Sequence, residues 1–174
     1  IIEWFEKNHP ENFKFYGLNW DKKYFSKPRI LRTLNRVNFV SKLFGTNYST
    51  YGGWVDDKLA TLKNYKFSIC FENVYGFTGY ITEKIFDSFL GSCIPIYLGA
   101  NNINDFVPSD CFIDQRNFKN INDTYQFIKS MDEKVYNNYL GNISRFLESH
   151  KFDVFCKDYF VNNFLKIFGL EHII

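Results

Sequence analysis

Two charged residues, Glu83 and Lys84, stand side by side in the stretch TGYITEKIFDSFLGSCIPIYLG, residues 78–99. A glycine-containing loop precedes them and an almost wholly apolar segment follows. A helix that begins here would present unpaired backbone N–H groups and a partial positive charge, which together favour a phosphate group. Lys84 would add a full positive charge, and Glu83 could accept hydrogen bonds from a ribose diol. The pair therefore indicates a nucleotide-linked substrate, with diphosphate on one side and ribose on the other.

A purely structural interpretation of the pair stays open beside this one. A glutamate in the first turn of a helix is favourable by itself, because the helix dipole prefers an anion there. Lys84 would then be an ordinary solvated side chain, and Asn73 and Tyr80 would be ordinary loop residues. The chain contains neither GxGxxG nor GxxxxGK[ST], which argues against a dinucleotide or ATP as the ligand.

Helices and strands are expected to alternate around this pair. The four-residue spacing of Ile81, Ile85 and Phe89 predicts a helix with one apolar face. The predicted strands are 13–17, 66–71, 93–99 and 111–114, and the predicted helices are 1–9, 56–65, 82–90, 121–131, 133–149 and 155–168. Pro95 argues against a central position for its strand. The alternation predicts an α/β fold, a Rossmann-like parallel sheet flanked by helices that binds its ligand at the carboxyl ends of the strands.

The composition is that of a globular protein and gives no indication of a nucleic-acid, membrane or metal partner. The 174 residues suffice for one domain, and 45% hydrophobic with 23% charged residues is typical of a globular chain. The net charge of +2 gives no reason to expect nucleic acid or an anionic membrane as a partner. The four cysteines lie far apart and the three histidines are scattered, so we expect buried thiols and no tightly bound metal.

Two segments do not follow the regular pattern. Residues 21–50 are rich in turn formers, and we expect them to form an excursion from the core with a helix near 31–43. The chain starts at Ile1 rather than at a methionine, in a segment typical of the middle of a helix. We therefore expect a fragment whose anchor, signal or partner domain, where one exists, lies upstream.

The segment 65–114 resembles the donor-binding segment of glycosyltransferase family 10, the α-1,3/4-fucosyltransferases. It carries YKF, FEN, YITEK, PIYLG and VPSDCFI in the order of that family. The stretches IIEWFEKNHPENFKFYGLNW and YGGWVDDKLATLKNY resemble the segments that precede these motifs. The resemblance covers most of the chain and is weakest at 21–50 and after about residue 150.

This resemblance implies a GT-B architecture of two Rossmann-like domains. Residues 1–174 would be a single GDP-fucose-binding domain, the C-terminal one, with the N-terminal acceptor domain missing. The implied reaction transfers L-fucose from GDP-fucose to a hydroxyl of a glycan acceptor, α-1,3 to GlcNAc or Glc, with inversion. The implied partners are GDP-fucose and the glycan acceptor, and no cofactor is implied. Eukaryotic members are Golgi membrane proteins, and bacterial members are cytoplasmic or peripheral.

The resemblance also assigns substrate-binding residues. Glu83 would bind the ribose hydroxyls and Lys84 the diphosphate, and Asn73 and Tyr80 would lie near the diphosphate and the fucose. Thr82 would belong to the same site. The family's general base lies upstream of this chain, so no catalytic residue is assigned here. The alternatives are transfer of another nucleotide sugar, or a nucleotide-binding module without catalysis.

Overall fold

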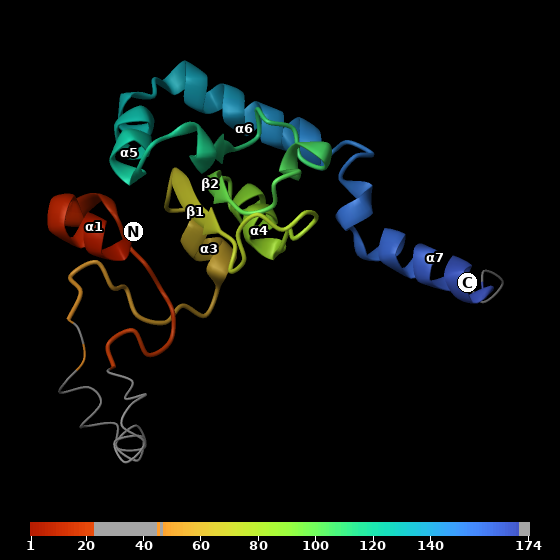
Figure 1. Ribbon diagram of the computed structural model, residues 1–174, viewed down its shortest axis with the longest axis horizontal. Coiled ribbons are helices and arrows are strands. Elements are labelled where there is room, and N and C mark those ends of the chain that lie inside the picture. Colours follow the sequence, from red (N-terminus) through yellow and green to blue (C-terminus); the bar gives the residue numbers. More distant parts are fainter. Residues whose placement is uncertain (23–44, 46, 171–174) are drawn as a thin grey trace, which may run out of the picture. The chain divides into compact units, whose positions relative to one another are not determined.

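The computed structural model describes residues 1–22, 45 and 47–170 (Figure 1), and the chain divides into two compact units, Ile1–Lys58 and Leu59–Ile174. In the first unit, the helix α1 (Ile2–Asn8) leads into the 3-10 turn η1 (Pro10–Asn12). Phe15 then forms an isolated parallel bridge with Tyr51. Backbone hydrogen bonds join Phe15 and Gly17 to residues 50–53, but only one residue pair has the geometry of a parallel ladder, so the predicted strand at 13–17 is reduced to this bridge. The helix predicted near 31–43 lies outside the described residues.

The second unit contains a three-stranded parallel sheet. Its strands are β1 (Phe67–Phe71), β2 (Ile94–Leu98) and β3 (Ile113–Asp114), in the order β1-β2-β3. The register places Ile69 opposite Ile96, and Ile96 opposite Ile113. Parallel neighbours need a crossover connection, and the helix α4 (Glu83–Leu90) supplies it between β1 and β2. The predicted α/β class with a parallel sheet is confirmed.

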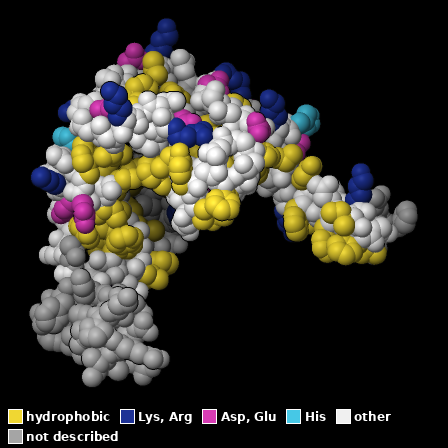
Figure 2. All heavy atoms as spheres, in the orientation of Figure 1, with side chains coloured by type: hydrophobic (Ala, Val, Ile, Leu, Met, Phe, Trp, Pro, Cys, Tyr) yellow, Lys and Arg dark blue, Asp and Glu magenta, His cyan; other side chains and the backbone are white. Residues whose placement is uncertain are grey.

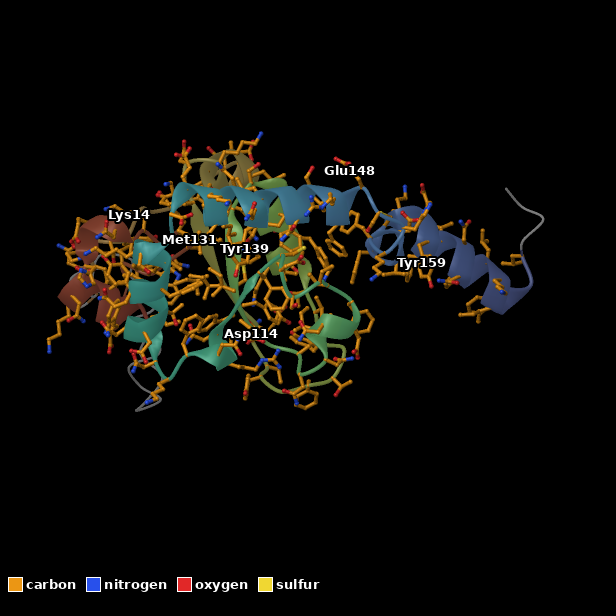
Figure 3. All side chains as sticks on the ribbon, turned by 90° about the horizontal axis from the view of Figure 1, so that it is seen from above. Lys14, Asp114, Met131, Tyr139, Glu148 and Tyr159 are labelled. Atoms are coloured by element: carbon orange, nitrogen blue, oxygen red, sulfur yellow. The ribbon has the colours of Figure 1, made fainter. Side chains whose placement is uncertain are left out.

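Helices cover both faces of β1. Alternate residues of a strand point to opposite faces. The thiol of Cys70 lies 3.0 Å from the hydroxyl of Ser88 on α4, whereas the Phe67 ring meets Tyr136 on α6 (Glu133–Leu147). In Figure 3, Tyr139 lies on the side of α6 that faces the strands. The apolar core of this unit thus forms between α4, the sheet and α6.

The remaining elements of the second unit agree with the predicted pattern. The helix α3 (Lys58–Leu62) precedes β1 and is shorter than predicted, and α5 (Ile121–Ser130) precedes α6. The 3-10 turns are η3 (Ile103–Asp105), η4 (Gln115–Asn117) and η5 (Asp153–Phe155). No disulfide joins the four cysteines, all of which lie in the described ranges. The predicted buried thiols are confirmed for Cys70, Cys93 and Cys111, whereas Cys156 is only partly buried.

Pro95 occupies a central strand, against the sequence-based expectation. The N–H group of Ile94 donates to the carbonyl of Lys66, so the nitrogen of the next residue points away from β1. On that other side, β3 begins to pair only at Ile96. The nitrogen of Pro95 therefore faces a position where the sheet needs no donor, and the proline is tolerated in the middle strand.

The helix α7 (Lys157–Phe168) ends at Gly169, which has a φ of 65° in the left-handed region that glycine favours. Much of its apolar stripe is exposed, and Figure 2 shows these side chains gathered along the helix. The exposed apolar members are Tyr159, Phe160, Phe164, Ile167 and Phe168. Among the described residues, no helix has the length and apolar character needed to cross a membrane.

Candidate functional site

The predicted pair lies where the sequence places it. Glu83 and Lys84 are the first two residues of α4, and β1 ends at Phe71, directly before the loop that leads to this helix. The carboxyl end of a parallel strand and the start of the next helix together form the usual ligand position in such sheets. The prediction of a strand–loop–helix unit with the charged pair in the first turn is confirmed.

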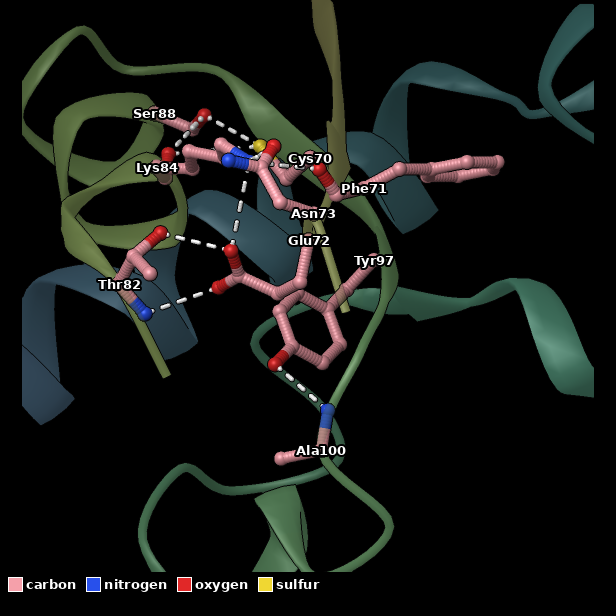
Figure 4. A network of polar contacts seen from close by, with 9 residues as sticks. All are labelled: Cys70, Phe71, Glu72, Asn73, Thr82, Lys84, Ser88, Tyr97 and Ala100. Atoms are coloured by element: carbon pink, nitrogen blue, oxygen red, sulfur yellow. Dashed lines mark hydrogen bonds and ion pairs between the residues drawn. The ribbon is translucent and has the colours of Figure 1, made fainter. Parts of the chain in front are cut away.

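Lys84 is held by three partners at the end of β1. Its Nζ atom donates to the backbone oxygen of Phe71 at 2.9 Å and to Oδ1 of Asn73 at 3.0 Å. It also forms an ion pair with Oε2 of Glu72, 3.4 Å away. The side chain of Lys84 is 27% exposed, so the ammonium group lies at the surface but in a fixed position. Figure 4 shows this arrangement.

Glu72 is the residue of this site that sequence reasoning missed. Its side chain is fully buried, and its two oxygens accept from Thr82, Oε1 from the N–H group at 2.9 Å and Oε2 from the hydroxyl at 2.7 Å. A buried carboxylate needs such partners, because desolvation of an unpaired charge is costly. The sequence does contain one indication of this role. Glu72 directly follows the apolar strand FSICF, and the carboxyl end of such a strand is where a ligand site is expected.

Thr82 is the N-cap residue of α4, but its hydroxyl does not act as a cap. It donates to Glu72, and no side-chain capping bond is present at this helix start within the described chain. At α5 and α6, by contrast, Asn120 and Asp132 accept hydrogen bonds from the first turn. The first-turn N–H groups of α4 are therefore left to solvent or to a ligand.

Two of the predicted residues lie outside this network. The side chain of Glu83 is exposed and makes no hydrogen bond or ion pair with any described residue. Tyr80 is also exposed, in the loop before the helix. The structure thus brings Asn73, Thr82 and Lys84 together around Glu72, and leaves Glu83 and Tyr80 facing solvent. The substrate contacts of all five residues stay predictions.

The loop between Asn73 and Ile81 is braced from the end of β2. Gly76 and Gly79 have φ angles of 81° and 76°, which non-glycine residues rarely adopt. The side chain of Asn101 donates to the carbonyl of Gly76 at 2.8 Å, and Oδ1 of Asn102 accepts from the N–H group of Gly79 at 2.8 Å. These bonds fix the loop that lies beside the start of α4.

A second cation, Arg116, holds Asn101, one of the two residues that fix this loop. Its guanidinium forms a bidentate pair with Asp114 at 2.6–3.0 Å and donates to the carbonyl of Asn101 at 3.1 Å. The hydrogen bonds to Asp114 raise the pKa of Arg116 above its usual value. Sequence reasoning did not single out Arg116, whose contact with Asn101 forms only where the end of β3 meets the end of β2.

A cavity of about 330 Å³ lies away from this site. Lys66 and Phe67 line it at the amino end of β1, together with Met131 and Tyr136. Ligands of parallel sheets bind at the carboxyl ends of the strands, so we place the functional site at the start of α4. Across the described residues, no group of three His, Cys, Asp or Glu side chains is arranged to hold a metal ion.

The fold and the site define a Rossmann-like α/β domain with a lysine and an uncapped helix start at the carboxyl end of its sheet. A family model described as glycosyltransferase family 10 (fucosyltransferase), C-terminal, matches residues 14–146. The chain belongs to glycosyltransferase family 10.

Curated relatives and solved structures agree with this assignment. An alpha-(1,3)-fucosyltransferase of Helicobacter pylori is 41% identical over 86 residues, which cover 49% of this chain and 18% of the relative. The mouse 4-galactosyl-N-acetylglucosaminide 3-alpha-L-fucosyltransferase 9 is 33% identical over 133 residues, 66% of this chain and 37% of the relative. A crystal structure of an alpha1,3-fucosyltransferase with GDP matches with a TM-score of 0.50 and 27% identity, over 78% of this chain and 40% of that one. The chain therefore spans well under half the length of these proteins.

Proposed function

We propose that the protein is a fucosyltransferase that transfers L-fucose from GDP-fucose to a hydroxyl of a glycan acceptor, α-1,3 to GlcNAc or Glc, with inversion. This chain binds the donor. The observation that carries the proposal is the fixed ammonium of Lys84 beside the uncapped start of α4, where a diphosphate fits by charge and by hydrogen bonding. The names of the matched relatives and the GDP held by a solved neighbour support the choice of donor.

Each predicted residue has a role in this proposal. Lys84 and the first-turn N–H groups bind the diphosphate, and the exposed carboxylate of Glu83 accepts hydrogen bonds from the ribose hydroxyls. Asn73 and Tyr80 lie near the diphosphate and the fucose. Thr82 contributes through the helix start, because both of its donors are directed at Glu72.

The chemistry follows from these roles. The acceptor oxygen forms a bond to the anomeric carbon of fucose from the face opposite the diphosphate, and the bond from that carbon to the diphosphate oxygen breaks. The acceptor's proton passes to a carboxylate base outside this chain. GDP leaves with added negative charge, which Lys84 and the helix start stabilise. Positive charge that is already in place lowers the barrier more than charge that must reorganise.

Nucleotide titration of the intact protein tests this proposal. Calorimetry with GDP, UDP and CMP should show the tightest binding for GDP, and incubation with GDP-fucose and a panel of glycans should yield a fucosylated product. Equal binding of UDP or CMP would point to another nucleotide sugar. GDP binding without transfer to any acceptor would point to a module without catalysis.

A further inference from the structure

We propose that Glu72 is a positioning residue for diphosphate recognition, and that its buried carboxylate fixes both the ammonium of Lys84 and the start of α4. This inference rests on the proposed function and adds a residue to it. Glu72 is fully buried, so it acts on the ligand through its neighbours. Two of these neighbours, Thr82 and Lys84, belong to the part of the chain that would meet the diphosphate.

The first action of Glu72 is on Lys84. A lysine side chain is long and flexible, and its ammonium group carries three N–H donors. Phe71 and Asn73 each accept a hydrogen bond from this group, and the carboxylate of Glu72 forms an ion pair with it at 3.4 Å, so three partners hold it in the ligand-free protein. Asn73 is the exposed member of this set. A phosphate oxygen can take its place, while Phe71 and Glu72 keep the ammonium where it is.

The second action is on the helix start. The carboxylate accepts from the N–H group and the hydroxyl of Thr82, which draws this hydroxyl away from the first turn of α4. The N–H groups of that turn are then available to an anion. One buried carboxylate thus directs the two positive features of the site, the ammonium and the helix dipole, toward the same ligand.

The charge of Glu72 has an opposing effect that the test must separate. A negative charge beside Lys84 repels the diphosphate, so a role through charge alone would weaken GDP binding in the parent protein. A positioning role would instead strengthen GDP binding in the parent protein. Glu72→Gln removes the charge and keeps the shape, whereas Glu72→Asp keeps the charge and draws it back by one methylene group.

The geometry of the site predicts that Glu72→Gln and Glu72→Asp both bind GDP less tightly than the parent protein. In Glu72→Gln, the amide oxygen can still accept from the Thr82 N–H group, but the NH₂ group then faces the donors of Lys84. In Glu72→Asp, the shorter carboxylate reaches either Thr82 or Lys84. We expect each variant to lose about tenfold in GDP affinity, which is the size of one charge-assisted hydrogen bond.

The experiment is a double-mutant cycle on the intact protein, with GDP and guanosine titrated into each variant by calorimetry. Glu72→Gln and Glu72→Asp are each made in the parent and in Lys84→Ala, and Glu133→Gln, at the exposed first residue of α6, is the matched control. We expect the loss of GDP affinity to be smaller in the Lys84→Ala background, because the part that acts through the lysine is gone while the part that acts through Thr82 remains. Guanosine affinity should stay the same in every variant, and Glu133→Gln should bind GDP as the parent does.

The other outcomes overturn distinct statements. A parent protein that binds GDP no better than guanosine overturns the proposed function. A parent that prefers GDP and loses this preference in Lys84→Ala, but keeps or gains GDP affinity in both Glu72 variants, overturns only the positioning role. Equal losses in both backgrounds overturn the action on Lys84, because the effect would then run only through Thr82 and the helix start. Where Glu72→Gln fails to fold, Glu72→Asp, which keeps the buried charge, decides the matter.

Discussion

Gly99 lies so close to Glu72 that a Cβ atom on Gly99 would be 2.5 Å from Cγ of Glu72. The same Cβ would be 2.4 Å from the hydroxyl of Tyr97, which accepts a hydrogen bond from the N–H group of Ala100 at 3.0 Å. Burial raises the pKa of Tyr97, so this hydroxyl stays neutral. The glycine directly after β2 therefore provides the space in which the side chain of Glu72 packs.

The first prediction is that Gly99→Ala destabilises the protein and disturbs the site. The new methyl group must displace Glu72 or Tyr97, and such overpacking costs about 1–3 kcal/mol in the free energy of unfolding. Urea denaturation would measure this loss, and GDP titration would show weaker binding. Gly141→Ala on α6 is the control, since its Cβ would meet open space. It should stabilise the helix by about 0.5–1 kcal/mol, and equal stability losses in both variants would contradict the prediction.

The second prediction separates the two halves of the charged pair. Lys84→Ala should weaken GDP binding by about ten- to a hundredfold, the contribution of a charge-assisted hydrogen bond, and leave guanosine binding little changed. Glu83→Ala should weaken both ligands, because guanosine keeps the ribose. Calorimetric titration would show this pattern.

Neither change at the pair should unfold the protein, because Glu83 is exposed and the buried Glu72 carboxylate keeps both donors of Thr82 when Lys84 is removed. Lys134→Ala, an exposed lysine in the first turn of α6, is the matched control. Parent-like GDP binding by both Lys84→Ala and Glu83→Ala would show that the pair only supports the helix.

The third prediction concerns pH and the first unit. The hydroxyl of Thr50 and the backbone N–H groups of Ser49 and Thr50 donate to the carboxylate of Glu6, and they lower its pKa from 4.5 to about 2. A depressed carboxylate pKa contributes stability above the unfolded value, and this stability is lost as the pH falls from about 4.5 toward 2. An NMR titration of the Glu6 carboxyl carbon should therefore have its midpoint near 2.

The variant Thr50→Val removes the largest cause of this shift, so it should raise the midpoint of Glu6 toward 4.5. A Glu6 midpoint that is the same in Thr50→Val and in the parent would show that the hydroxyl does not set the pKa.

The fourth prediction is that transfer needs no tightly held metal. Lys84 and the start of α4 supply positive charge at the position proposed for the leaving diphosphate. Activity of the intact enzyme should therefore survive treatment with EDTA. Complete loss that a divalent metal restores would contradict this expectation.

Local sequence pattern predicted the parts of the site that depend on local structure. The spacing of Ile81, Ile85 and Phe89 defined the apolar face of α4, and Ile85 and Phe89 are buried as this spacing requires. The start of the helix followed from the glycine-containing loop before it. The position of Glu83 and Lys84 could therefore be read from the sequence without knowledge of any distant contact.

Features that depend on distant contacts could not be read in this way. Glu72 becomes a site residue only because Thr82 folds back onto it and Gly99, directly after β2, leaves room for it. The brace between Arg116 and Asn101 likewise joins the ends of two strands. In each case the sequence shows an ordinary polar residue, and its partner is fixed only by the assembled sheet.

Pro95 has a consequence for how the sheet finds its alignment. If β2 slid by one residue along β1, the nitrogen of Pro95 would replace the N–H group that Ile94 now donates to Lys66. The misaligned sheet would lack that hydrogen bond, and the apolar side chains of β2 would exchange faces. The proline thus penalises this alternative pairing and costs nothing in the correct one. The residues of β2 are apolar on both faces, so hydrophobicity alone discriminates poorly between alignments. The missing N–H group of Pro95 therefore helps to select the native alignment.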